Sequence, residues 1–189
     1  MARIALDIDS TLHHYWDLLD ELSRRRFGIA LPYDEQKTWS ITQLEPDQLK
    51  ALVEETHSHD NVVEAEPYPE AVQTVRDWHE QGHYIHITSH RSDSARAATE
   101  RWLERIGMPY DDLHCSYDKL SRCVELDIDV LVDDSPVNLN RAREQGILGA
   151  TIIHPWNVEL VEADDVIGGR DWAELRVKLD QVLNRRQAN

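Results

Sequence analysis

The stretch "RIALDIDSTLHHYW", residues 3–16, decides the expected fold. It begins with a short apolar segment, residues 4–8, that Asp7 interrupts and Asp9 follows. Successive side chains of a strand alternate between its two faces, so Asp7 and Asp9 are expected to point the same way at one strand end. Two carboxylates that close raise each other's pKa or require a cation. The pair therefore predicts a functional site where the first strand ends.

Further segments have the length and composition of buried parallel strands. They are "YIHIT" (84–88), "DVLVD" (129–133), "ATIIH" (150–154) and a weaker candidate, "LHCS" (113–116). Amphipathic stretches of helical period lie between them, and each ends in Gly: 69–82, 94–107 and 137–146. This alternation predicts an α/β fold, a Rossmann-like doubly wound parallel sheet whose ligands bind beyond the carboxyl ends of the strands.

The segment after the first strand breaks this alternation. Residues 15–28 and 46–59 have helical patterns, and no strand is evident between them. We therefore expect an α/β core domain of residues 1–12 and 67–189, with a small helical cap subdomain of residues 13–66 inserted after the first strand. Helices at this point would cover the strand ends, and such a cover can exclude water from a site.

The charge balance limits the classes of ligand. The chain of 189 residues has 36 acidic and 20 basic residues, for a net charge of −16. This charge argues against nucleic acid or an anionic membrane as a partner. An anionic substrate would need local positive charge from a metal, a Lys or Arg side chain, or backbone amides.

Cysteine content and hydropathy predict the compartment. Cys115 and Cys123 are too few for a disulfide framework or a metal cage, and they are consistent with a reducing cytoplasm. The sequence opens without the apolar region of a signal peptide, and no apolar run reaches the length of a membrane span. A cytoplasmic protein is therefore expected. Nothing in the sequence predicts its oligomeric state.

The predicted strand ends bring chemically matched side chains to one cleft. They are Asp7 and Asp9 after the first strand, Thr88, Ser89 and Arg91 after segment 84–88, Asp133 and Asp134 after segment 129–133, and Lys119 at the start of the helix before that strand. Carboxylates crowded in this way are explained by a hard divalent cation among them, and Mg²⁺ takes carboxylate oxygens, carbonyl oxygens and water.

These residues also carry a family resemblance. "LDIDSTL" resembles the DxDx[TV] opening motif of the haloacid dehalogenase superfamily, and "IHITS", Lys119 and "VLVDDSP" are similar to its second, third and fourth motifs. Within the superfamily, the chain resembles the 5′(3′)-deoxyribonucleotidases, the 5′-nucleotidase type C family. They share the helical cap, a P-x-P-x-A-V pattern (residues 67–72) and a "DK" before the final "DD".

The resemblance implies a Mg²⁺-dependent phosphomonoester hydrolase that acts through an aspartyl-phosphate. Asp7 would attack the phosphorus, and Asp9 would protonate the leaving oxygen and later accept a proton from water. Asp7, the backbone carbonyl of Asp9 and the Asp134 carboxylate would hold the metal. Asp9 disfavours a haloalkanoate dehalogenase, because a halide leaves without a proton.

The remaining residues of the set receive supporting roles. Asp133 is expected to orient Lys119 or a metal-bound water rather than to bind the metal. Thr88 and Ser89 would bind phosphoryl oxygens, and Lys119 would neutralise the phosphate. For Arg91 two interpretations stay open: it binds phosphate or substrate, or it faces solvent at a helix start.

The substrate also stays open between two classes. Cap aromatics of the deoxyribonucleotidases stack on the base, and Tyr15 and Trp39 fall at matching offsets, although packing within the cap explains both equally well. A nucleoside monophosphate is therefore the first expectation, and another small phosphorylated metabolite, such as a sugar phosphate, is the alternative. A receiver-like phosphoacceptor module is a rival of another class, but it carries its acid pair on the first strand and its phosphorylated Asp on a later one.

Three further positions receive structural interpretations. Ser10 stands at a tight turn where many relatives have Gly, and we expect it to keep a negative φ. His57 and His59 form an HxH pattern without a third ligand at a convincing spacing, so they are assigned to a polar helix end. His13 and His14 are assigned to the surface, with the option that one of them faces substrate.

Overall fold

The computed structural model describes residues 1–187 and has a six-stranded parallel sheet of order β3-β2-β1-β4-β5-β6. The strands are β1 (Arg3–Leu6), β2 (Tyr84–Ser89), β3 (Asp112–Cys115), β4 (Val130–Val132), β5 (Leu148–Ile152) and β6 (Ile167–Gly169). The predicted doubly wound α/β fold is confirmed. Because the strand order changes direction between β1 and β4, a crevice opens at their carboxyl ends.

One predicted strand is confirmed from a weak signal, and one strand was not predicted. The weaker candidate around residue 113 is β3, and β6 has no counterpart in the prediction. β6 contains Gly168 and Gly169, so its sequence lacks the apolar run that indicates a strand. A Cβ at Gly169 would lie 2.5 Å from the backbone nitrogen of Leu175. Glycine here allows the last helix to pack directly against the strand.

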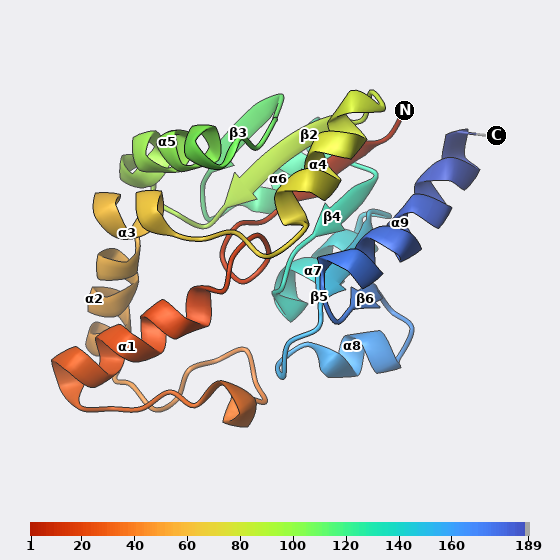
Figure 1. Cartoon of the computed structure of the whole chain (residues 1–189). Coiled ribbons are helices and arrows are strands. Elements are labelled where there is room, and N and C mark those ends of the chain that lie inside the picture. Colours follow the sequence, from red (N-terminus) through yellow and green to blue (C-terminus); the bar gives the residue numbers. More distant parts are fainter. Residues whose placement is uncertain (188–189) are drawn as a thin grey trace.

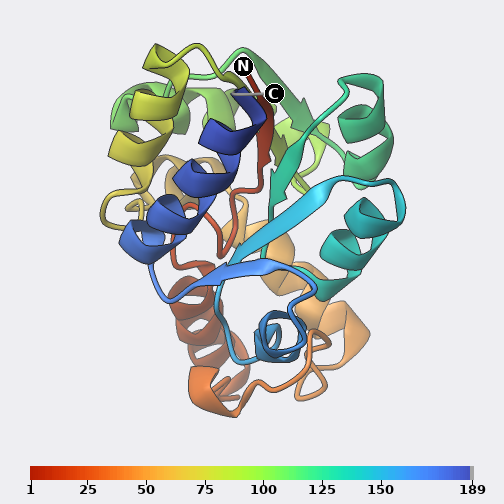
Figure 2. The ribbon, with the colours of Figure 1, turned by 90° about the vertical axis from the view of Figure 1, so that its right-hand side faces the viewer.

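Helices cover both faces of the sheet. One face carries α4 (Ala71–Glu80), α5 (Arg96–Ile106) and α9 (Trp172–Gln187), and the other carries α6 (Lys119–Glu125) and α7 (Pro136–Glu144). Figure 2 shows α4 and α9 on one side and α6 and α7 on the opposite side.

Alternation along β1 decides which way the site residues point. Ile4 and Leu6 belong to the core on the α4 and α9 side, and Ala5 belongs to the smaller core under α6 and α7. The same alternation places Asp7 on the side of Ala5. Register with β4 places Asp133 on that side too, because Leu131 packs there and Val132 does not.

The segment after β1 is helical, as predicted. It contains α1 (Tyr15–Phe27), the short 3₁₀ helix η1 (Tyr33–Glu35), α2 (Pro46–Thr56) and α3 (His59–Glu64). These elements lie beyond the carboxyl ends of the strands, at the opposite end of the molecule from both termini (Figure 1). The exact limits of a cap subdomain, residues 13–66, remain a prediction.

The cap has its own apolar cluster, which one residue of the α/β core joins. Its buried members are Trp16, Leu19, Leu22, Leu31, Leu44, Leu52 and Trp156. Two short helices complete the chain, η2 (Asp93–Ala95) and α8 (Val158–Glu162). None of the helices within residues 1–187 is both long and apolar enough to cross a membrane.

Candidate active site

Three buried carboxylates meet at the crevice between β1 and β4. Asp7, Asp133 and Asp134 each offer an oxygen within 4.8 Å of the others. The amide of Asp7 donates to the Val132 carbonyl at 2.8 Å and so continues the β1–β4 pairing. Lys119, at the start of α6, contacts the Asp7 carboxylate and donates to Asp133 Oδ2 at 3.1 Å. We call these four side chains the floor.

The floor carries more negative charge than its lysine can balance. Burial raises the pKa of Asp7 to about 7, and Asp133 and Asp9 add to the effect against the opposing charge of Lys119. Burial, together with Asp7 and Asp133, raises the pKa of Asp134 well above its ordinary value. Burial alone would lower the pKa of Lys119, but Asp133 and Asp7 raise it. A divalent cation fits this set, because carboxylate oxygens are its preferred ligands.

The two adjacent acids of the floor differ in their partners. Asp133 accepts hydrogen bonds from the Ser135 amide at 2.8 Å, from Asn138 Nδ2 at 3.0 Å and from Lys119. No hydrogen bond from the described residues reaches the Asp134 carboxylate. Asp134 therefore keeps its lone pairs for a metal, whereas those of Asp133 are used to hold Lys119 and the start of α7.

The end of β2 supplies an unpaired hydroxyl. Thr88 is fully buried, and its Oγ1 has no hydrogen-bond partner within the described part of the chain. A buried polar group without a partner costs free energy, which binding of a phosphoryl oxygen would offset. Ser89 Oγ instead accepts from the Arg91 amide at 3.2 Å, so it shapes the turn after the strand.

Asp9 lies among three nitrogen-bearing side chains, Arg91, His13 and His57, which we call the clamp. Arg91 Nη2 is 2.6 Å from Asp9 Oδ1, and Arg91 Nε is 3.2 Å from Asp9 Oδ2. His13 Nε2 lies 2.9 Å from Oδ1, and His57 Nε2 lies 3.3 Å from Oδ2. Arg91 is 1% exposed, so of its two interpretations the solvent-facing one is wrong.

The surface assignment of His13 is wrong, and the helix-end assignment of His57 is right but leaves out its contact with Asp9. His13 is buried against Asp9 rather than placed on the surface. His57 does end α2, but its ring turns inward and reaches Asp9 from the cap. Both contacts depend on where the cap lies over β1, and local sequence patterns do not determine that placement.

The clamp decides the charge of Asp9. Burial would raise the pKa of this carboxyl, but Arg91 and His57 hold it well below its ordinary value. In this arrangement the Asp9 carboxyl is ionised. Donation of a proton by Asp9 would require its carboxylate first to leave Arg91 and take up a proton.

The turn after β1 is strained. Ser10 has φ of 60°, so the expectation of a negative φ is wrong. Non-glycine residues rarely occupy this left-handed region, and they do so where surrounding contacts hold them. Here the Ser10 carbonyl pairs with His154 Nε2 at 2.7 Å. The contact comes from the loop after β5, which thus supports the turn between Asp9 and the cap.

A cavity of about 410 Å³ lies above the floor and under the cap. Its upper walls are mainly apolar and include Trp16, Leu19, Trp39, Ile41, Leu49, Val53 and Trp156. We call these seven side chains the roof. Tyr15 and His57 also line the cavity, and the Tyr15 hydroxyl is paired with Thr56 Oγ1 at 2.7 Å. Trp39 is 41% exposed and forms part of the rim.

The loop after β5 holds site residues that the sequence analysis did not identify. Trp156 lines the cavity, and Trp156 Nε1 and Asn157 Nδ2 donate to the Asp134 carbonyl at 3.2 and 3.1 Å. A signal was available, because "HPWN" (154–157) directly follows a predicted strand at the carboxyl edge of the sheet.

Fold and site together define a class. A doubly wound parallel sheet with a helical insertion after β1, an acid directly after that strand, and a lysine and an acid pair at the neighbouring strand are the features of a haloacid dehalogenase-type hydrolase. Residues 1–181 match the family described as 5′ nucleotidase, deoxy (Pyrimidine), cytosolic type C protein. The chain belongs to this family.

Individual relatives agree with this assignment. The chain is 26% identical over 153 residues to "Putative nucleotidase OB0422" of Oceanobacillus iheyensis, covering 74% of this chain and 80% of that protein. A haloacid dehalogenase-like family protein from Streptococcus pneumoniae superposes with a TM-score of 0.65 at 17% identity, over 89% of this chain and 93% of that one. A hydrolase of the superfamily from Ehrlichia chaffeensis gives a TM-score of 0.61 at 13% identity, over 97% and 99%. These structures support the fold.

Proposed function

We propose that the protein is a Mg²⁺-dependent 5′-nucleotidase that hydrolyses nucleoside monophosphates. The observation that carries the proposal is the buried floor of three carboxylates and one lysine beneath a largely apolar cavity. Asp7, Asp134 and the Asp9 carbonyl would hold Mg²⁺, which supplies charge neutralisation and orientation for phosphoryl transfer. The description of the family as cytosolic supports the cytoplasmic placement expected from the sequence.

The proposed chemistry has two displacement steps. Asp9 first leaves Arg91 and takes up a proton from a monoanionic substrate phosphate or from solvent. A carboxylate oxygen of Asp7 attacks phosphorus, the bond to the ester oxygen breaks, and that oxygen takes this proton from Asp9. Water then attacks the phosphorus of the aspartyl-phosphate, Asp9 accepts its proton, and the bond to Asp7 breaks to release phosphate. Asp9 thus alternates between a protonated state at the leaving group and the ionised state beside Arg91.

Lys119 and Thr88 are assigned to the phosphoryl group. The Lys119 ammonium lies against Asp7, where it can neutralise charge on both the nucleophile and the phosphate. The unpaired hydroxyl of Thr88 is a donor for one phosphoryl oxygen. Ser89 is a weaker candidate for binding a phosphoryl oxygen, because its hydroxyl already accepts a hydrogen bond from the Arg91 amide.

The roof supports a nucleoside rather than a sugar as the leaving group. Aromatic and aliphatic side chains form most of the upper walls, so sugar hydroxyls would find few hydrogen-bond partners there. Lys119 is the one Lys or Arg among the described residues that line the cavity, which favours a single phosphate. A receiver-like module is set aside, because the chain belongs to a family of hydrolases.

A substrate screen tests the proposal. Purified protein with Mg²⁺ is assayed for phosphate release from nucleoside monophosphates, sugar phosphates, p-nitrophenyl phosphate and acetyl phosphate. We expect kcat/KM for nucleoside monophosphates to exceed that for sugar phosphates by at least about tenfold, equal to about 1.4 kcal/mol. Preference for a sugar phosphate would replace the proposed substrate class, and single-round labelling without turnover would refute hydrolysis.

A further inference from the structure

Trp156 brings an aromatic side chain of the α/β core into the roof. It follows β5, is 7% exposed and lines the cavity above the floor. Its ring centroid lies 5.2 Å from that of Trp16 and 6.2 Å from that of Trp39, both of which belong to the cap. The roof is therefore shared between cap and core, and Trp156 is its buried centre.

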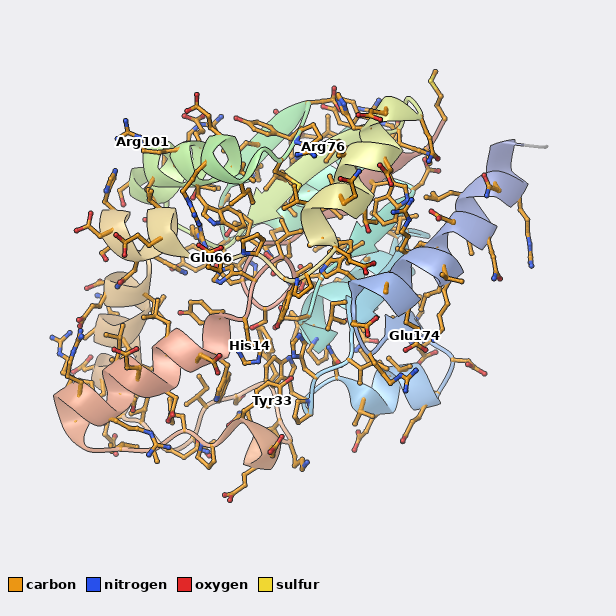
Figure 3. The ribbon with its side chains drawn as sticks, viewed as in Figure 1. His14, Tyr33, Glu66, Arg76, Arg101 and Glu174 are labelled. Atoms are coloured by element: carbon orange, nitrogen blue, oxygen red, sulfur yellow. The ribbon has the colours of Figure 1, made fainter. Side chains whose placement is uncertain are left out.

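The Trp156 ring is held in place from the core side. The His154 ring stacks on it with a centroid distance of 4.6 Å and an interplanar angle of 4°. His154 itself is fixed at both nitrogens, by the Tyr33 hydroxyl at 2.6 Å and the Ser10 carbonyl at 2.7 Å. Figure 3 shows Tyr33 beside His14 at this junction of cap and core. An aromatic wall with so little freedom is preorganised for a rigid ligand.

The same side chain reaches the floor. Trp156 Nε1 donates to the Asp134 carbonyl, the backbone of an acid of the floor. Asn157 donates to the same oxygen, so two side chains of this loop position the end of β4. The cap residue Trp16 differs, since its Nε1 donates to the Leu31 carbonyl within the cap.

We propose that Trp156 is a specificity-determining residue, which contacts the ring of the leaving nucleoside through its indole and positions Asp134 through its N–H. The inference rests on the proposed function, since the nucleoside is the ligand it names. It assigns two roles to one side chain: Trp156→Phe removes the N–H alone, and the difference between Trp156→Leu and Trp156→Phe isolates the ring.

Trp156→Leu removes the ring and Trp156→Phe retains a ring without the N–H. At saturating Mg²⁺, Trp156→Leu should raise KM for nucleoside monophosphates roughly 5- to 100-fold, the range for loss of one base–aromatic contact. Its kcat/KM for acetyl phosphate should stay within about twofold of that of Trp156→Phe, because both variants lack the N–H and the leaving group of acetyl phosphate has no ring. Trp156→Phe should keep KM for nucleotides within about threefold but need roughly 10-fold more Mg²⁺ for half-maximal activity.

Trp78→Phe is the matched control, because it removes a buried indole and its 2.7 Å hydrogen bond to Asp180 far from the cavity. It should leave both KM values unchanged. If Trp156→Leu does not fold, Trp156→Met keeps an apolar side chain and tests the same KM prediction. Equal losses on nucleotides and acetyl phosphate would show a structural role and overturn the proposal.

A second pair of substrates separates this proposal from the proposed function. If the wild-type protein hydrolyses no nucleotide, the nucleotidase assignment fails on that result alone. Trp156 is then judged by the ratio of KM for p-nitrophenyl phosphate to KM for acetyl phosphate, since only the first has an aromatic ring. A rise of that ratio in Trp156→Leu supports an aromatic-binding role, and an unchanged ratio refutes it.

Discussion

The floor and the roof of the cavity differ in the chemistry of their side chains. The floor consists of Asp7, Lys119, Asp133 and Asp134, and it joins three carboxylates and one ammonium through ion pairs and hydrogen bonds to Asp7 and Asp133. The roof consists of large apolar side chains from two parts of the chain. We assign phosphoryl transfer, which is common to all phosphomonoesters, to the floor, and we assign discrimination between leaving groups to the roof. Substitutions in the two regions should therefore change different kinetic constants.

The largest effect is expected at Asp7. An amide oxygen cannot displace the ester oxygen, so Asp7→Asn should lower kcat by about 10⁴-fold or more on every substrate. Phosphate release from a nucleotide and from acetyl phosphate measures this effect. Asp60→Asn is the matched control, because its side chain is 91% exposed on the cap, and its rates should equal those of the wild type. Activity of Asp7→Asn within tenfold of the wild type would exclude Asp7 as the nucleophile.

Substitutions of the neighbouring acids Asp133 and Asp134 should lower activity less than Asp7→Asn does, and in different ways. Asp134→Ala removes the carboxylate that no protein group occupies, and we expect roughly a 10³-fold loss of kcat/KM that added Mg²⁺ does not restore. Asp133→Asn keeps the shape that holds Ser135 and Asn138, so it should raise the half-saturating Mg²⁺ concentration about 10- to 100-fold. Titrating activity with Mg²⁺ measures both. If Asp133→Asn proves the more damaging change, the two roles are reversed.

Metal removal should couple stability to pH. The folded-state pKa of Asp7 is about 7, above its ordinary value of 3.8, so the folded protein retains a proton that the unfolded chain releases. Without metal, the free energy of unfolding should therefore fall as pH rises from about 4 to 7. Mg²⁺ binds the ionised form, and its stabilising effect should be larger at pH 8 than at pH 5.

Thermal unfolding with Mg²⁺ or with a chelator at both pH values measures this coupling. At a Mg²⁺ concentration about 100 times its Kd, the free energy of unfolding at pH 8 should increase by about 2.7 kcal/mol. For a chain of this length, this increase raises Tm by roughly 5 to 10 °C. An equal gain at both pH values would contradict the raised pKa of the floor.

The smallest effect is expected at the rim of the roof. Trp39 is partly exposed, so Trp39→Leu should raise KM for nucleoside monophosphates only about 5-fold, the low end of a base–aromatic contact. Activity on acetyl phosphate should not change, because that substrate does not reach the roof. A parallel loss on acetyl phosphate would mean that Trp39 stabilises the closed cap rather than the ligand.

The sequence predicted the floor well, for a physical reason. Parallel strands align their carboxyl ends, so the acids at the ends of predicted strands 4–8 and 129–133 had to meet. Lys119 followed from its place at a helix start beside that edge. None of this depends on the details of side-chain packing, which is why local patterns sufficed.

The roof and the clamp on Asp9 were less predictable. His57 reaches Asp9 across 48 positions of sequence, because the end of α2 lies beside the turn after β1, and no local period encodes that placement. Trp156 was not predicted, because it enters the roof from a loop of the α/β core and only the folded structure brings that loop against the cap. Ser10 adopts a positive φ because His154 holds its carbonyl, a contact formed only in the complete fold.

The central claim is that Asp7 forms a covalent phosphoenzyme and that the Asp9 carboxyl acts on protons alone. Intact-protein mass spectrometry after an acid quench tests this claim most directly. Asp9→Asn is mixed with Mg²⁺ and acetyl phosphate, whose leaving group needs no proton, and is quenched rapidly in acid. Because hydrolysis lacks its base, worth about 10²- to 10⁴-fold, we predict one added phosphoryl group that hydroxylamine removes, and none on Asp7→Asn. An adduct on Asp7→Asn, or none on Asp9→Asn while the wild type turns over, would contradict the account.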